Sequence, residues 1–281
     1  MRIRIWGCRG SLTTAGRAVV RYGGYTTCVE VRLENGTLLI LDAGSGIHKL
    51  GNRLLGETGL TDIYLLLTHS HWDHLTGFPF FTPAYLAKYA IHVRGGPDAK
   101  SSLANFLRHQ MDPPYFPVEF SVLKARFDFG SNDGGELSIG SAHIVPIALS
   151  HPNGGYGFRI VEKGKSLVFL TDTELGFSHP GALREEDYLE AARGADLLLH
   201  DAQYSDEEYA GRTRGWGHST YTRAADFAAR AGVRRLGTFH HDPDHGDAEI
   251  DASIRLCRKV LRERRSSVSC FGAAEGLEIR L

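Results

Sequence analysis

Residues 68–74 read Thr-His-Ser-His-Trp-Asp-His and directly follow the apolar run Ile-Tyr-Leu-Leu-Leu at 63–67. Three imidazoles and one carboxylate therefore crowd the end of an expected buried strand, on His69, His71, Asp73 and His74. Each imidazole in a partly dry site needs a polar partner, and a divalent metal provides one partner for all of them. Neutral imidazole and carboxylate groups suit zinc and its neighbours. The segment therefore predicts a metal site in preference to a histidine-rich surface loop.

Other side chains that suit a metal also come directly after apolar stretches. The cluster at 69–74 is too short to complete two metal shells, so further ligands are expected at other strand ends. The candidates are His151 after residues 144–149, Asp172 after 167–170, and His240 and His241 after 236–239. A strand end holds a ligand on a rigid backbone. We therefore expect one site that is assembled from four parts of the chain.

This arrangement resembles the metallo-β-lactamase superfamily of metal-dependent hydrolases. The resemblance rests on the His-X-His-X-Asp-His signature with its downstream candidates in the expected order, and it runs from Trp-Gly-Cys-Arg-Gly-Ser at 6–11 to the final helix. It implies an α/β fold, an αββα sandwich with the metals at one edge between two sheets. The length of 281 residues, without a linker-like stretch, predicts that residues 1–281 form a single domain.

The resemblance also implies the ligand set. It assigns one metal to His69, His71 and His151, and the second to Asp73, His74 and a final histidine, with Asp172 bridging the two. His240 best matches the final histidine because it is the first one beyond the strand, and His241 is the alternative. Asp42, in Leu-Asp-Ala-Gly, resembles an early aspartate that supports the site without binding metal. A purely structural role for Asp42 is the other interpretation.

A later motif indicates the branch of the superfamily. Residues 217–220, Gly-His-Ser-Thr, resemble the His-X-Thr motif of the phosphodiesterase branch, which includes tRNA 3′-processing endonucleases and cyclic-nucleotide phosphodiesterases. By this resemblance His218 contacts the phosphate and acts as general acid, and Asp201 is a candidate to orient it. The alternative for His218 is a helix N-terminal residue beside a capping Ser219 or Thr220. The β-lactamases and the glyoxalases of the superfamily match less well, because they lack this motif.

The expected reaction is hydrolysis of a phosphodiester. Two divalent ions, zinc or alternatively manganese, would share a hydroxide that attacks phosphorus. The leaving oxygen needs a proton, which we expect from His218, and Asp73 is expected to act in catalysis as well as in metal binding. The favoured substrate is a small phosphodiester such as a cyclic nucleotide.

Two other functions stay open on the sequence. A tRNA 3′-processing nuclease is less favoured, because the bacterial form of that family carries its tRNA-gripping arm between the counterparts of His151 and Asp172, where this chain has only the twenty residues 152–171. The balance of 32 Lys and Arg against 33 Asp and Glu also gives no basic bias for nucleic acid. The third possibility is a redox or thiol-oxidising relative with a single iron. The number of metal ions per chain would distinguish it from a two-metal hydrolase.

The cysteines and the N-terminal residues indicate in which compartment of the cell the protein is expected. The four cysteines show no paired spacing, and no signal peptide or apolar run of membrane-spanning length is seen. We therefore expect a cytoplasmic protein without a membrane partner. Relatives in this branch are often dimers, which leaves a homodimer open.

The remaining pattern predicts the elements around the site. Strands are expected at 37–41, 63–67, 158–161 and 166–170, and helices at 101–110, at 222–231 and after Asp247 as its N-cap. Residues 78–130 are less regular. Their aromatic segments at 78–81 and 113–117 are expected to form either a lid over the core or a wall of the substrate cleft, where a base could stack.

Overall fold

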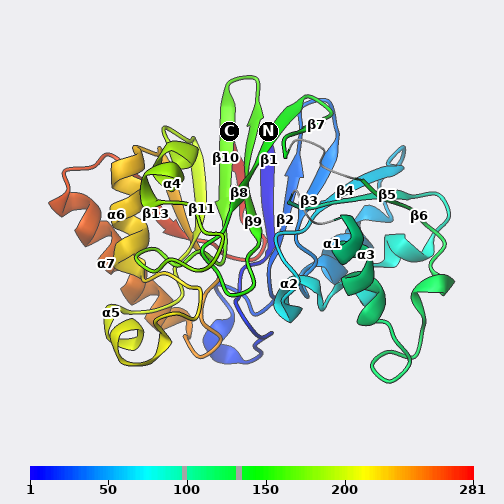
Figure 1. Ribbon diagram of the computed structural model, residues 1–281, viewed down its shortest axis with the longest axis horizontal. Helices are drawn as coiled ribbons and strands as arrows, with labels where there is room; N and C mark the ends of the chain where they lie inside the picture. The colour runs from blue at the N-terminus through cyan, green and yellow to red at the C-terminus, as the bar shows by residue number, and fades with distance from the viewer. Residues whose placement is uncertain (97–99, 131–134) are drawn as a thin grey trace.

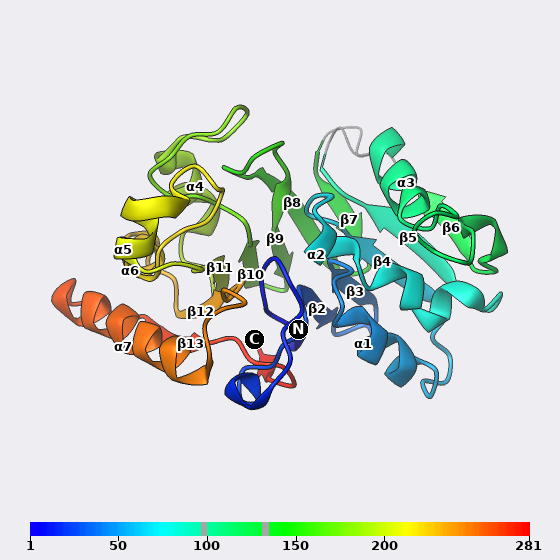
Figure 2. The ribbon, with the colours of Figure 1, turned by 90° about the horizontal axis from the view of Figure 1, so that it is seen from below.

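Two facing β-sheets, with helices on their outer sides, make up the fold (Figures 1 and 2). The structure is a computed structural model, and it describes residues 1–96, 100–130 and 135–281. Helices α1 and α3 cover one sheet, and α4, α6 and α7 cover the other. This is the αββα sandwich that the sequence predicted.

The first sheet is antiparallel over its first strands and parallel over the rest. Its strands are, in spatial order, β14 (Glu278–Arg280), β1 (Arg2–Gly7), β2 (Cys28–Arg32), β3 (Leu38–Leu41), β4 (Asp62–Leu66), β5 (Ala90–Arg94) and β6 (Arg126–Phe129). The helices on this side are α1 (Ile47–Leu54), α2 (Trp72–Leu75) and α3 (Lys100–His109).

The second sheet mirrors this organisation, with parallel pairing from β10 to β13 and antiparallel pairing from β7 to β10. Its strands are, in spatial order, β13 (Ser269–Gly272), β12 (Arg235–Phe239), β11 (Leu197–Asp201), β10 (Lys165–Leu170), β9 (Tyr156–Glu162), β8 (Ala142–Ala148) and β7 (Leu137–Ile139). The helices on this side are α4 (Glu185–Ala192), α5 (Asp206–Glu208), α6 (Tyr221–Ala231) and α7 (Asp247–Glu263). Short helical turns lie in the connections, at Arg17–Val19, Phe78–Phe80, Thr82–Tyr85, Phe120–Val122 and Tyr209–Thr213.

Three apolar clusters fill the spaces between the four layers. Because successive side chains of a strand point to opposite faces, β3 places Leu39 and Leu41 between the sheets and Leu38 and Ile40 under α1. The same alternation recurs in the second sheet. Burying one such side chain completely contributes about 1.5–3 kcal/mol, so strands that are apolar on both faces are held firmly on both sides. These rigid strands end at the site.

The site lies at the edge where the parallel strands end. β3 and β4 run parallel in the first sheet, as do β10, β11 and β12 in the second. The residues that follow these strands therefore emerge at the same edge of each sheet, and the two edges face each other. In open α/β sheets this is the edge where ligands bind.

Most of the predicted elements are confirmed. Helix α3 covers the segment predicted at 101–110, and α6 ends at Gly232, which has a φ of 63° and is a left-handed cap. Asp247 is not an N-cap as predicted: it is the first residue of α7, and Gly246 precedes it as the cap. The Asp247 carboxylate instead accepts hydrogen bonds from the backbone N–H groups of Arg21 and Tyr22.

The aromatic segments of residues 78–130 divide between core and surface. Phe78 and Phe81 are fully buried and pack in the cluster under α1. Phe80 and Tyr115 are exposed. No helix in the described ranges is long and apolar enough to cross a membrane.

Candidate metal centre

The segment that the sequence singled out lies at the carboxyl end of β4. The strand ends at Leu66, and the chain then passes through His69 and His71 into the short helix α2. His71 is the N-terminal boundary residue of α2, and Asp73 and His74 lie within the helix and are buried. The tight turn into α2 brings these side chains to one place.

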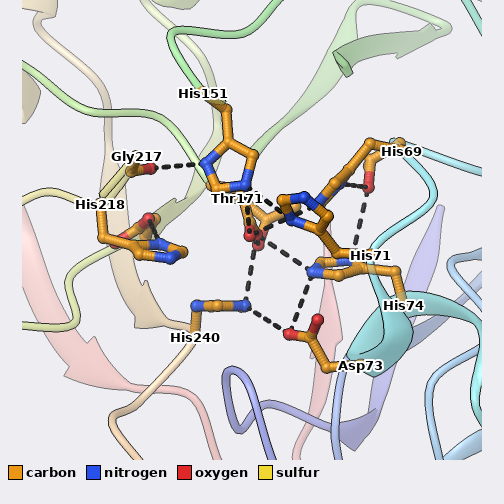
Figure 3. Close-up of polar contacts among 12 residues, drawn as sticks. His69, His71, Asp73, His74, His151, Thr171, Gly217, His218 and His240 are labelled. Atoms are coloured by element: carbon orange, nitrogen blue, oxygen red, sulfur yellow. Dashed lines mark hydrogen bonds and ion pairs between the residues drawn. The ribbon is translucent and has the colours of Figure 1, made fainter. Parts of the chain in front are cut away.

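A first group of ligand atoms belongs to His69, His71, His151 and Asp172, and these atoms all lie within 4.8 Å of one another. His71 Nδ1 is 3.0 Å from His151 Nε2. Asp172 Oδ2 is 3.6 Å from His69 Nε2 and 3.7 Å from His151 Nε2. Figure 3 shows the three imidazoles converging, two from the segment after β4 and His151 from the segment after β8.

A second group belongs to Asp73, His74, Asp172 and His240, again within 4.8 Å. Asp73 Oδ2 lies 3.3 Å from His74 Nε2 and 3.0 Å from His240 Nε2. Asp172 Oδ1 lies 3.2 Å and 3.3 Å from the same two nitrogens. The Asp172 carboxylate thus turns one oxygen to each group, which is the arrangement of a bridging ligand.

Three residues at the strand ends have left-handed backbones. Asp42 follows β3 with a φ of 62°, Asp172 follows β10 with 52°, and His240 follows β12 with 57°. Side chains other than glycine seldom adopt this conformation, and it persists only where the surrounding structure enforces it. Here it turns each side chain from the strand end toward the space between the sheets.

The donor set fits a divalent metal. Two of its buried nitrogens, His69 Nε2 and His74 Nε2, have no hydrogen-bond partner. Since buried polar atoms normally have one, both nitrogens are explained by a cation between them and the carboxylates. Imidazole nitrogens and carboxylate oxygens are the donors that zinc and manganese accept.

The ring orientations of His69 and His74 are fixed from outside the cluster. Asp42 accepts a hydrogen bond from His74 Nδ1–H at 2.7 Å, and it also accepts from the backbone N–H and the hydroxyl of Thr68. The Thr68 hydroxyl oxygen in turn lies 3.1 Å from His69 Nδ1. Because these oxygens hold the Nδ1 protons, the Nε2 atoms are the ones that face the cluster and can bind a metal.

Similar contacts hold the ligands of the second sheet. His240 Nδ1–H donates to Gln203 Oε1 at 2.9 Å, and the Gln203 amide N–H donates to Asp242. His151 Nδ1–H donates to the Gly217 carbonyl at 3.0 Å. A Cβ on Gly217, whose φ is 95°, would lie 1.9 Å from His151 Nδ1, so only glycine fits this close approach.

The pKa values of the ligands favour metal binding. Burial lowers the pKa of His69 well below its usual range and that of His151 to about 4, so both are neutral. Burial would raise the pKa of Asp172, but His240 and His74 hold it well below the usual range. Burial also opposes charge on His74, yet the carboxylates of Asp172 and Asp73 raise its pKa well above the usual value. A divalent cation would take the place of the proton on His74.

His218 lies beside the second group, held by Asp201. Its Nδ1–H donates to Asp201 Oδ2 at 2.8 Å, and its ring stacks on His240 with centroids 4.9 Å apart and planes at 17°. Burial opposes charge on His218, but the carboxylate of Asp201 outweighs it and raises the pKa to about 9. The structure therefore places a positively charged imidazole beside the second ligand group.

The two neighbours of His218 in the motif have structural contacts. Thr220 is the N-cap of α6, and its side chain accepts from the Arg223 N–H. The Ser219 hydroxyl donates to the Thr173 carbonyl. His218 thus lies just before the N-cap of α6, and this position leaves its ring free to face the second ligand group.

His241, the alternative final ligand, points away from the cluster. Its Nε2–H donates to the Ala273 carbonyl at 2.9 Å, whereas His240 reaches Asp73 and Asp172. The geometry therefore favours His240 of the two.

Glu174 was not predicted from the sequence, although it organises one side of the site. It is buried, and its two oxygens accept hydrogen bonds from Tyr209, His179 and the backbone N–H groups of Gly215 and Gly217, at 2.7–2.9 Å. It thereby fixes the loop whose Gly217 carbonyl orients His151. Its place two residues after Asp172 was the only sequence signal.

The fold and the paired ligand clusters define a class, the metal-dependent hydrolases built on an αββα sandwich. Residues 37–241 match the family described as "Beta-lactamase superfamily domain", and the chain belongs to the metallo-β-lactamase superfamily. Within it, the similarity to ribonuclease Z places the chain in the branch that includes phosphodiesterases and tRNA-processing enzymes.

One relative carries this placement, and two solved structures share the fold. The chain is 30% identical to a ribonuclease Z of Gemmatimonas aurantiaca over 286 residues, which cover 85% of this chain and 88% of the relative. A diphosphatase of the PhnP family shares the fold with a TM-score of 0.68 and 16% identity, over 100% of this chain and 97% of the other. Zn²⁺-bound PqqB of Methylobacterium extorquens has a TM-score of 0.70 and 17% identity, with 100% of both chains covered.

Proposed function

We propose that this protein is a phosphodiesterase that uses two divalent ions to cleave a small phosphodiester such as a cyclic nucleotide. The observation that carries the proposal is the His218–Asp201 pair beside the two ligand groups. A buried histidine that stays protonated is a proton donor, and its neighbours in the cluster are suited to bind the metals that a phosphoryl group needs.

Each residue has a proposed role. The first ion would be held by His69, His71 and His151, the second by Asp73, His74 and His240, with Asp172 shared. When bound, such ions activate water and offset the negative charge of a phosphoryl group. His218 contacts the phosphate and gives its proton to the leaving oxygen, while Asp201 keeps the ring in the orientation this transfer needs. Zinc is the proposed metal, and manganese is the alternative.

The connection between His151 and Asp172 supports a small substrate. Strands β9 and β10 follow each other through a turn at Lys163 and Gly164, and the segment contains no further extension between residues 151 and 172, all of which are described. The near-equal numbers of basic and acidic residues also offer little attraction to a polyanion. The four cysteines are buried and unpaired, which supports a reducing, cytoplasmic location.

A second candidate is a tRNA-processing nuclease. The observation that favours it is the 30% identity to a ribonuclease Z along 88% of that protein's length. Both candidates use the same cluster and the same acid, so the substrate, and not the chemistry, separates them.

The test begins with protein purified without chelators. Metal content is measured by elemental analysis, and hydrolysis is followed first with bis(p-nitrophenyl) phosphate and then with cyclic AMP and a precursor tRNA carrying a 3′ trailer. Two zinc or manganese ions per chain and a higher kcat/KM for the cyclic nucleotide would support the proposal. Preference for the precursor tRNA would select the nuclease, and a single iron without cleavage would overturn both.

A further inference from the structure

A concave pocket opens beside the first ligand group. It encloses about 430 Å³ of empty space, its open mouth included, and its lining is Ser70, Trp72, Leu75, Phe106, His109, Gln110 and Tyr115. One wall belongs to α2 and the loop before it, and the other to α3 and the residues that follow it. The site described above uses none of these side chains.

The pocket and the metal centre share one segment of chain. Ser70 and Trp72 line the pocket, and they alternate along the chain with the ligand residues His69, His71 and Asp73. The pocket therefore begins one residue away from the first ligand group. For a substrate whose phosphate contacts that group, the substituent next to the phosphate would have to extend past Ser70 and Trp72 to enter the pocket.

The aromatic walls suit a flat, apolar ring. Trp72 and Tyr115 are 67% and 63% exposed, and together with Leu75 and Phe106 they give the pocket a mostly apolar lining. The Tyr115 ring packs edge-on against His109 with centroids 5.5 Å apart, and His109 Nδ1–H donates to Asp112 at 2.6 Å. This wall is thus preorganised, and aromatic faces of this kind stack nucleobases.

A polar group in the wall lacks a partner. The Gln110 Nε2 atom is buried and has no hydrogen-bond partner, although buried amides normally have one. An amide can both donate to and accept from the polar edge of a base. Because this nitrogen is buried, a bound base can accept from it only after the Gln110 side chain turns toward the pocket, and this turn would give the nitrogen the partner that it lacks.

We propose that this pocket binds the nucleobase of the nucleoside esterified to the scissile phosphate. The base stacks on Trp72 and Tyr115, and Gln110 bonds its polar edge. This inference rests on the proposed phosphodiesterase function and narrows its substrate class to nucleotide esters. It applies equally to a cyclic nucleotide and to the nucleotide at a cleavage point in RNA, because both present a base next to the reacting phosphate.

The test compares two esters with the same leaving group, thymidine 5′-p-nitrophenyl phosphate and methyl p-nitrophenyl phosphate, on the metal-loaded enzyme. Trp72→Ala and Tyr115→Ala are each expected to lower kcat/KM for the thymidine ester about tenfold, through KM, because base stacking is lost. The kcat/KM for the methyl ester should change less than twofold in both variants. Phe80→Ala is the matched control, since Phe80 is an aromatic residue of the same side, 56% exposed, and lies outside the pocket lining. Equal losses for both esters, or no loss, would overturn the inference.

A binding measurement separates this inference from the proposed function. AMP is expected to quench tryptophan fluorescence, and the quenching should vanish in Trp72→Phe but persist in Trp216→Phe, which replaces the other exposed tryptophan. If the enzyme cleaves neither ester, the phosphodiesterase proposal fails, and quenching that depends on Trp72 would still support a base site. If quenching by AMP persists in Trp72→Phe, the pocket is not a base site. If Trp72→Ala has half the molecular mass of the unmodified protein in solution, the pocket is instead a contact between two copies of the chain.

Discussion

The two walls of the metal centre are built in different ways. The compact wall is the single segment 68–74, in which four polar side chains follow one strand within a short loop and one helical turn. The assembled wall belongs to the second sheet, and its members come from widely separated segments: His151, Asp172, Asp201, His218 and His240. The compact wall depends on local geometry, whereas the assembled wall depends on the parallel register of β10, β11 and β12.

Both walls are held by contacts from elsewhere in the chain. Asp42 holds the compact wall through Thr68 and His74, from which it is 26 and 32 residues away. Glu174 holds a loop of the assembled wall through the Gly217 N–H, 43 residues away in sequence. Each wall supplies ligand atoms to both groups, so the loss of one ligand should affect one metal, whereas the loss of Asp172, which faces both groups, should reach both.

The largest effect is expected for Asp172→Ala. The carboxylate turns one oxygen to each ligand group, so its loss should remove at least one metal and lower turnover by about a thousandfold or more, since bound metals contribute several kcal/mol. His69→Ala, in the compact wall, should lose at most the first metal. Elemental analysis and kcat for bis(p-nitrophenyl) phosphate measure both effects, and intact stoichiometry in Asp172→Ala would contradict the shared role.

His218→Ala should separate catalysis from metal binding within the assembled wall. We expect both metals to stay and kcat to fall by about 10²–10⁴-fold, the usual contribution of a general acid. His218 must be protonated to act, and Asp201 raises its pKa to about 9, so the rate should decline above that pH. In Asp201→Asn the pKa of His218 is lower, and the decline should begin at lower pH. An undiminished rate in His218→Ala would remove the residue from the mechanism.

A pair of support variants compares the walls directly. In Glu174→Gln an amide NH₂ would face N–H and O–H donors, so the loop at Gly217 must shift and release His151. We expect the affinity for the first metal to fall 10–100-fold, which is typical when a contact that orients a ligand is lost. Asp42→Asn should lower the affinity for the second metal to a similar extent, because Asp42 orients His74.

Competition with a chelator, followed by metal analysis, would measure the two affinities. Glu190→Gln serves as the control, because Glu190 is an exposed partner of Arg193 far from the cluster. If both support variants weakened the same metal, the assignment of His151 and His74 to different metals would be wrong.

The difference between the walls also explains what the sequence could predict. The compact wall could be predicted from the sequence because its candidate ligands are close together in the chain and follow an apolar strand. His151, Asp172 and His240 were found from their positions after apolar runs and from the family resemblance. The choice between His240 and His241 depended on which way the chain turns after β12, where His240 takes a left-handed backbone. Their roles as ligands stay predictions.

Contacts that depend on tertiary structure were not predictable. Glu174 looks like any loop carboxylate, and its partners include backbone groups that the sequence pattern does not distinguish. Strand β5 was missed because its five residues include His92 and Arg94 beside the buried Ile91 and Val93. The helix cap at Gly246 was missed because Asp247, a common N-cap, bonds to a distant loop instead.

The smallest effect tests whether the compact wall tolerates a change in its own sheet. Glu30, on β2, is buried and accepts hydrogen bonds from Trp6 and Arg32. Burial opposes its ionisation, but the hydrogen bonds from Arg32 and Trp6 and the charges of Arg32 and Arg53 together outweigh burial and lower the pKa of Glu30 below its ordinary value. Glu30→Gln should lower the free energy of unfolding by about 2 kcal/mol at pH 7, the scale of hydrogen bonds to a charged group.

The pH dependence of this loss has a definite sign. A carboxyl with a lowered pKa in the folded state stabilises the protein above its unfolded pKa, and this contribution disappears as the pH falls through the folded value. The difference between Glu30→Gln and the unmodified protein in urea unfolding should therefore shrink below about pH 4.5, the ordinary value for the group. Metal content and kcat should be unchanged at neutral pH, since Glu30 lies outside both ligand groups. A loss of metal in this variant would show that the compact wall depends on more of its sheet than the segment 68–74.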